Sequence, residues 1–365
     1  MLEGYERGIG LGGWLTNFKR IAVLPPEWRM RLTPGDFEHF ETYITREDIR
    51  RIAGWGLDHI RMPFDQLVVE DFDRPGHYRE EGLRHLDNVI DWCRHEGLNI
   101  ILNCHKAFGM YCDLGVQTEL LTNAEYQERF CAMWRMLDTR YAGLDMPFEL
   151  MNEISMPDNA LWNQVAPKLI GGIRAEAPAR KLIIGGANYN SADCLMDLRL
   201  YDDPNISYTF HFYEPFAFTH QRGILQQKPA IYNRAMRYPD DMAPYLAYLN
   251  FFGDVTADYD RFERMDRRFI EWKLRPVLNF QQRHPGKELY FGEFGTIRHA
   301  DIRSRENWMR DVIGFAVRNG IPYCSWNYLS CPYDGNRFSL TDDDRRLPLS
   351  GELPCILRGE PVLNP

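Results

Sequence analysis

Short apolar runs alternate with amphipathic segments along the chain, and this alternation predicts the fold. Apolar runs typical of buried strands recur at residues 8–11, 59–62, 99–104, 147–151, 181–184, 207–212, 288–291 and 322–326. Helical patterns separate nearly all of them. In residues 82–96, for example, Leu83, Leu86 and Val89 recur at helical spacing and Gly97 follows. Continuous apolar runs of this kind indicate strands of a parallel sheet that is buried on both faces.

Eight strands alternating with helices predict an α/β fold, a (β/α)₈ barrel formed by residues 1–365 as a single domain. Two helix starts carry the pattern of a capping box, Thr45 with Asp48 and Thr122 with Glu125. The rival fold is a doubly wound open sheet. It is disfavoured because the glycine-rich segment 8–13 lacks the G-x-G-x-x-G spacing, and no glycine-rich phosphate loop follows any strand.

The alternation is interrupted after the sixth strand, at residues 214–258, where the pattern predicts an extended loop without a clean strand or helix. Its aromatic residues are Phe216, Phe218, Tyr232, Tyr238, Tyr245, Tyr248, Phe251 and Phe252. A long loop after a barrel strand lies at the catalytic face. We therefore expect it to wall a substrate cleft, with most rings packing the loop onto the barrel and a minority touching ligand.

The charge and the apolar content of the chain limit which kinds of partner it can bind. The net charge is −9 and no basic cluster is present, so neither nucleic acid nor an anionic membrane is expected. No apolar stretch reaches the roughly 20 residues of a membrane span, and the start of the chain lacks the pattern of a signal peptide. The eight cysteines show no C-x-x-C pair and no zinc-type spacing, and we expect them to be reduced. We expect a monomer in the cytoplasm; the alternative is the mature form of a secreted enzyme.

Glu153 and Glu293 are the candidate catalytic residues, because each ends a short apolar run. Carboxylates delivered by different strands of one barrel would face each other across its mouth. Hydrolysis of a glycosidic bond needs such a pair, one carboxyl as proton donor and the other as nucleophile or base. One glutamate alone would be read as a surface residue; the pair, with Asn152 before one and glycines flanking the other, favours catalysis.

Other polar and aromatic residues are expected at the same rim of the barrel. They are Arg61, His105, Asn152, His211, Tyr213 and Trp326. Donors such as Arg61 and Tyr213 would lower the pKa of the nucleophilic glutamate, while the other glutamate holds a proton near neutral pH. Asn152 could bind the sugar 2-hydroxyl, and Trp326 offers a flat apolar face for a pyranose ring. The alternatives are that Trp326 belongs to the barrel core and that His105 is a structural histidine.

Seven segments together resemble glycoside hydrolase family 5, in that family's order and through nearly the whole chain. They are residues 8–15, 60–63, 102–107, 148–153, 208–215, 292–295 and 325–328. The resemblance implies a retaining mechanism with Glu153 as acid/base and Glu293 as nucleophile. It also implies that the six rim residues form the surrounding subsite, and that no cofactor or metal is needed.

Two departures from the family's pattern concern sugar contacts. The third strand ends in Asn103, Cys104 and His105, where the family commonly has Asp-Leu-His, which changes the hydrogen bonding behind the histidine. Tyr189 stands where relatives often carry a tryptophan nearby.

Segments 12–15 and 211–215, by resemblance, favour a β-glucan or gluco-oligosaccharide as the partner, and we predict a retaining glycosidase of the endo-β-1,4-glucanase type. Exo-acting β-glucosidase or β-1,3-glucanase and β-mannanase remain open on the same scaffold. A catalytically dead sugar-binding barrel is the hypothesis from another class, and it is disfavoured because a binder has no reason to keep both glutamates.

Overall fold

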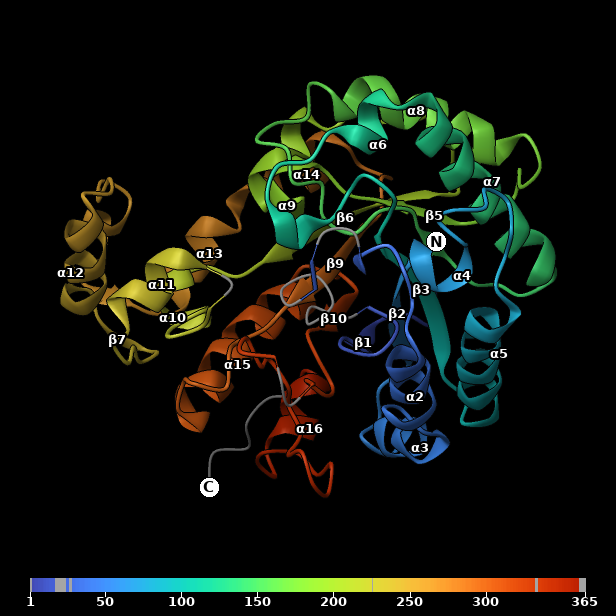
Figure 1. The fold of residues 1–365 in the computed structure, drawn as a ribbon. Helices are drawn as coiled ribbons and strands as arrows, with labels where there is room; N and C mark the ends of the chain where they lie inside the picture. The colour runs from blue at the N-terminus through green and yellow to red at the C-terminus, as the bar shows by residue number, and fades with distance from the viewer. Residues whose placement is uncertain (1, 17–23, 26–27, 225, 332–333, 361–365) are drawn as a thin grey trace.

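The computed structural model describes residues 2–16, 24–25, 28–224, 226–331 and 334–360, and eight parallel strands close into a barrel (Figure 1). Around the barrel the strands are β1 (Arg7–Gly10), β2 (His59–Asp65), β3 (Asn99–Lys106), β4 (Phe148–Glu149), β5 (Leu182–Ile184), β6 (Ile206–Phe212), β9 (Leu289–Phe294) and β10 (Tyr323–Ser325). Each overlaps one of the predicted strands, and β10 pairs with β1 to close the ring. The prediction of a (β/α)₈ barrel is confirmed.

Helices surround the strands and bury their apolar faces against them (Figure 1). In chain order they are α2 (Pro34–Thr42), α3 (Arg46–Gly54), α4 (Gln66–Val69), α5 (Glu80–His95), α6 (Glu119–Thr122), α7 (Ala124–Arg140), α8 (Trp162–Arg174), α9 (Ala187–Asn190), α14 (Arg275–Arg283), α15 (Ile302–Arg318) and α16 (Leu353–Leu357), with 3₁₀ turns η2 (Cys112–Leu114) and η3 (Ala192–Asp197). No helix of the described residues is long and apolar enough to span a membrane.

One of the two predicted helix caps is wrong. The capping box of Thr45 and Asp48 opens α3 as expected. At α7, however, Asn123 is the N-cap, and its side chain accepts hydrogen bonds from the backbone N–H groups of Glu125 and Tyr126. Thr122 instead ends α6. An asparagine is as good a cap as a threonine, so the two neighbouring candidates compete and the sequence pattern does not decide between them.

The glycine-rich first strand allows the barrel to close tightly around Trp326. A Cβ atom at Gly12 would lie 2.5 Å from the ring of Trp326, and one at Gly10 would lie 2.8 Å from it. Both positions therefore require glycine so that this ring can lie against the backbone. The segment thus shapes the mouth of the barrel, which explains why its spacing differs from that of a phosphate-binding loop.

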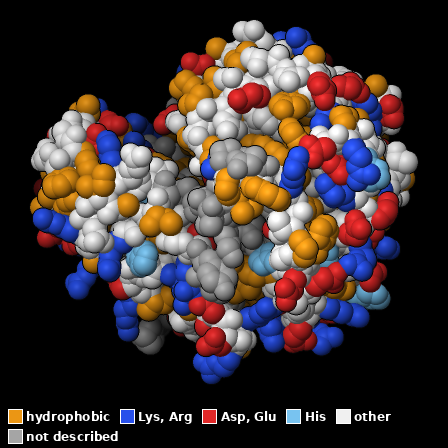
Figure 2. All heavy atoms as spheres, in the orientation of Figure 1, with side chains coloured by type: hydrophobic (Ala, Val, Ile, Leu, Met, Phe, Trp, Pro, Cys, Tyr) orange, Lys and Arg blue, Asp and Glu red, His pale blue; other side chains and the backbone are white. Residues whose placement is uncertain are grey.

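Residues 214–258 contain short helices and a short strand, so the prediction of a segment without a clean strand or helix is wrong. The segment after β6 contains α10 (Phe216–Thr219), α11 (Gln227–Tyr232), β7 (Asp240–Asp241), α12 (Ala243–Phe252) and η4 (Tyr259–Arg261), and returns through β8 (Arg264–Met265) and α13 (Arg267–Lys273). We call residues 214–273 the excursion. It lies beside the barrel as a separate lobe (Figure 1), with the surface hollowed between the two (Figure 2).

Four aromatic rings of the excursion pack on one another, whereas most rings were expected to pack the segment onto the barrel. Tyr232, Tyr248, Phe251 and Phe252 form a cluster with ring centroids 4.9–6.5 Å apart. Such contacts stabilise short helices that would not persist alone. All eight cysteines of the chain are free, in agreement with the prediction.

Candidate active site

Glu153 and Glu293 meet at the mouth of the barrel. Glu293 lies in β9, and Glu153 follows the end of β4. Each offers a carboxylate oxygen, and together with a ring nitrogen of His211 these atoms lie within 4.8 Å of one another. Retaining glycosidases hold their carboxyl groups about 5–5.5 Å apart, whereas inverting enzymes need about 6.5–9.5 Å to admit a water molecule. The short separation agrees with the spacing expected of a retaining pair.

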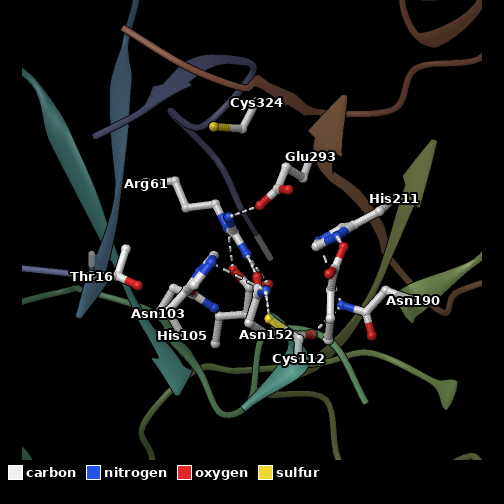
Figure 3. Close-up of polar contacts among 12 residues, drawn as sticks. Thr16, Arg61, Asn103, His105, Cys112, Asn152, Asn190, His211, Glu293 and Cys324 are labelled. Atoms are coloured by element: carbon white, nitrogen blue, oxygen red, sulfur yellow. Dashed lines mark hydrogen bonds and ion pairs between the residues drawn. The ribbon is translucent and has the colours of Figure 1, made fainter. Parts of the chain in front are cut away.

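Glu293 accepts a hydrogen bond on each oxygen, and Figure 3 shows the one from Arg61. Arg61 Nη1 donates to Oε2 at 2.7 Å, and the Tyr213 hydroxyl donates to Oε1 at 2.7 Å. Both contacts were expected from the sequence. Arg61, however, does not lie at the rim where it was expected: β2 continues to Asp65, and Arg61 lies inside this strand with its side chain fully buried.

Glu149 is a functional residue that the sequence did not reveal. It lies on β4 inside the barrel and is fully buried. Its two oxygens accept from Arg61 Nε at 2.6 Å and Nη2 at 2.8 Å, and Asn152 Oδ1 also accepts from Nη2 at 2.6 Å. A two-pronged contact of this kind fixes the plane of the guanidinium group. Glu149 thereby aims Arg61 at Glu293.

Glu153 is held by a histidine whose own orientation is fixed. Its Oε1 lies 2.8 Å from His211 Nδ1, and Asn190 Nδ2 lies 3.4 Å from His211 Nε2. An amide nitrogen can only donate, so Nε2 accepts and Nδ1 carries the hydrogen that points at Glu153. Asn190 also donates to the carbonyl oxygen of Asn152. Its backbone φ of 57° lies in the left-handed region, which asparagine enters more readily than most residues.

The two glutamates differ in how their pKa values are set. Burial, reinforced by the negative charge of Asp113, raises the pKa of Glu153 to about 8. Burial also raises the pKa of Glu293, while Arg61 and the Tyr213 hydroxyl act in the opposite direction. The two donors therefore lower the pKa of Glu293 as expected, but the loss of solvent outweighs them and the net shift is upward. Burial lowers the pKa of His211 to about 4, so this ring is neutral at neutral pH.

Trp326 and His105 form one wall of the site. Their rings are stacked, with centroids 5.4 Å apart and planes 5° from parallel. Trp326 is partly exposed and lines the cavity, so it is not barrel core. His105 is buried, and Asn103 Oδ1 lies 3.1 Å from its Nδ1. Asn103 therefore supplies the hydrogen-bond partner behind the histidine.

A buried lysine next to His105 also went unnoticed in the sequence. Lys106 Nζ donates to Thr16 Oγ1 at 2.6 Å and lies 3.1 Å from Asp113 Oδ2 and 3.7 Å from Asp65 Oδ1. The carboxylates of Asp113 and Asp65 raise the pKa of Lys106 despite its burial, so it stays charged. The spacing of residues in the sequence gives no sign that a charged lysine lies beside this wall.

One cavity of about 530 Å³ is lined by both glutamates and by His105, His211, Tyr213 and Trp326. Arg61 and Asn152 are buried and are not part of this lining. The cavity runs from Thr16 and Lys106, past the two glutamates, to residues Glu214 and Phe216 of the excursion. The expectation that the excursion walls the cleft is therefore confirmed. The cluster of Glu153, His211 and Glu293 has a spacing that could hold a metal ion. The positive charge of Arg61, 2.7 Å from Glu293, opposes a cation there, and the absence of a resident metal stays a prediction.

Comparison with known proteins places the chain among the cellulases. The family model described as Cellulase (glycosyl hydrolase family 5) matches residues 28–331. Endoglucanase C of Acetivibrio thermocellus is 34% identical over 362 residues, which cover 98% of each chain. Cellodextrinase A of Ruminococcus flavefaciens is 29% identical over 326 residues, covering 87% of this chain and 84% of its own. The structure of Thermotoga maritima Cel5A in complex with cellobiose superposes with a TM-score of 0.68 at 22% identity and covers 98% of this chain and 97% of its own. The chain therefore belongs to glycosyl hydrolase family 5.

Proposed function

We propose that this glycoside hydrolase is an endo-β-1,4-glucanase that works by double displacement, with Glu293 as nucleophile and Glu153 as acid/base. The observation that carries the proposal is that an oxygen of one carboxyl group lies within 4.8 Å of an oxygen of the other, while the two groups have different surroundings. Arg61 and Tyr213 donate to both oxygens of Glu293, whereas Glu153 has a pKa of about 8. One group is thus equipped to carry negative charge and the other to carry a proton.

In the first step, a Glu293 oxygen attacks C1 of the sugar while Glu153 donates its proton to the glycosidic oxygen. The bond between C1 and that oxygen breaks, and the leaving sugar departs with a free 4-hydroxyl group. Asn152 is fixed by Arg61 and can bind the 2-hydroxyl, a contact that strengthens as positive charge develops at C1. Trp326 supports the apolar face of the same sugar.

In the second step, water attacks C1 of the glycosyl-enzyme from the side that the leaving sugar vacated. Glu153, now ionised, takes a proton from this water, and the bond between C1 and Glu293 breaks. The product keeps the β configuration, and both glutamates return to their starting protonation states. His211 Nδ1–H donates to Glu153, which holds the carboxyl group in position through both proton transfers.

Two curated relatives support a β-1,4-glucan as the substrate, since one is named endoglucanase and the other cellodextrinase. A dead sugar-binding barrel is disfavoured because both glutamates and all their donors are in place. The substrate is tested with 4-nitrophenyl β-cellobioside, β-glucoside and β-mannoside and with a soluble cellulose derivative. We expect the cellobioside to react fastest and the viscosity of the polymer to fall early, as internal cleavage requires.

Faster hydrolysis of the glucoside, with glucose accumulating at constant viscosity, would indicate an exo-acting β-glucosidase. Preference for the mannoside would indicate a mannanase. A Glu293→Gln variant serves as the control in each assay, because it keeps the shape of the site and lacks the nucleophile.

A further inference from the structure

A second cavity of about 460 Å³ lies within the excursion. It is bounded by α10, α11, α12 and η4, and a volume in this range is typical of sites that bind small molecules. Four of its residues also line the catalytic cavity: Glu214, Phe216, Gln226 and Gln227. The two cavities are therefore contiguous, and a chain bound at the glutamates could extend into the second one.

The shared residues carry the chemistry that binds sugars. Phe216 is 40% exposed and lines both cavities. Glu214 and the amides of Gln226 and Gln227 can accept or donate hydrogen bonds to hydroxyl groups. Glu214 is oriented by a hydrogen bond from the Tyr259 side chain and by the positive charge of Lys273. The apolar ring can pack on the C–H face of a pyranose, while the polar groups beside it can bind the hydroxyl groups at the edge of the same sugar.

The position of the excursion on the barrel indicates which part of the substrate would occupy this cavity. Trp326 follows β10 and Lys106 ends β3, so the sugar wall lies on the half of the ring formed by β10, β1, β2 and β3. A line from Glu153, which follows β4, to Glu293 on β9 divides the ring of strands in two. The excursion follows β6, which lies on the opposite side of this line from that wall. If the sugar that is attacked rests on Trp326, the departing part of the chain extends toward the excursion.

We propose that the second cavity is a saccharide subsite for the leaving-group end of a β-glucan, with Phe216 as its stacking platform and Glu214 as its hydroxyl acceptor. This inference rests on the proposed function and names the part of the substrate that the excursion binds. The subsite acts at least one sugar beyond the bond that is cleaved. It therefore favours substrates long enough to place sugars on both sides of the glutamates.

The test compares a long and a truncated substrate in the full-length enzyme. Cellopentaose can fill the second cavity, whereas an aryl β-cellobioside has only an aromatic leaving group. For Phe216→Ala, the ratio of kcat/KM on cellopentaose to kcat/KM on the aryl cellobioside should fall about tenfold, as expected for the loss of one ring contact. Glu214→Gln should lower the same ratio in the same direction, and the cleavage position in cellopentaose should shift in both variants.

Ile231→Ala is the matched control, because this residue lies on α11, is 65% exposed and lines neither cavity. Its ratio should equal that of the parent enzyme. An unchanged ratio and cleavage pattern in Phe216→Ala would overturn the proposal, and so would a loss of the same size on both substrates, which indicates a structural role. If the parent enzyme hydrolysed neither substrate, the proposed function itself would fail.

Discussion

Replacing Glu153 by glutamine should make the protein more stable at alkaline pH, because the parent enzyme holds this carboxyl group in an environment that disfavours its charge. Burial raises the pKa of Glu153 from 4.5 to about 8. Between these two values the unfolded chain has lost the proton and the folded protein retains it, so the free energy of unfolding falls as the pH rises. A pKa difference of about 3.5 corresponds to about 5 kcal/mol.

Glutamine removes this cost and keeps the shape of the side chain. Its Oε1 can still accept the hydrogen bond from His211 Nδ1. Urea unfolding of parent and variant between pH 4 and pH 9 measures the effect. The variant's advantage should grow by about 1.4 kcal/mol for each pH unit above 4.5 and level off above pH 8. An advantage of the same size at pH 5 and pH 9 would refute the assignment of this pKa to Glu153.

The same pKa predicts how activity depends on pH. For a substrate whose leaving group needs protonation, kcat/KM should fall about tenfold per pH unit above pH 8, as Glu153 loses its proton. A dinitrophenyl cellobioside, whose leaving group departs unprotonated, should lack this alkaline decline. Because the two carboxyl groups interact, the measured value belongs to the pair. A decline of the same size with both substrates would assign it to a different group.

Three further variants test the roles of individual carboxyl groups. Glu293→Ala should be folded and inactive, and azide should restore turnover and give a glycosyl azide of opposite configuration to the substrate. Glu153→Ala with azide should give a glycosyl azide of unchanged configuration. NMR of the products separates the two outcomes, and the reverse pattern would exchange the roles of the two glutamates. Glu149→Gln should lower the free energy of unfolding in urea by about 3 kcal/mol, because it leaves the fully buried Arg61 with one fewer counter-charge; a loss below about 1 kcal/mol would contradict the anchoring role.

The sequence predicted the barrel because each parallel strand is buried on both faces and so appears as a continuous apolar run. It also predicted Glu153 and Glu293, since a carboxylate after such a run has few structural uses. Glu149 was missed for a related reason: it lies within an apolar run, and nothing in the pattern shows that a buried arginine from another strand neutralises it. Ion pairs between distant segments leave no local signal.

The helices of the excursion were missed because their sequences lack helical periodicity. Residues 243–252 of α12 are apolar at almost every position, so no single face stands out. Short elements such as α10 and α11 depend on contacts with the rest of the fold. The raised pKa of Glu293 was missed because the sequence shows which donors are present and does not show how deeply they are buried.

Trapping the glycosyl-enzyme tests the central claim most directly. A dinitrophenyl 2-deoxy-2-fluoro-β-cellobioside should inactivate the enzyme, because fluorine slows both steps and the reactive leaving group restores the rate of the first step only. Trypsin cleaves after Lys287 and Arg298 and releases residues 288–298, which contain both Glu288 and Glu293. Fragment mass spectrometry should locate the sugar on Glu293. A label on Glu153 or Glu288, or turnover without any covalent adduct and with inversion at C1, would contradict the double-displacement account.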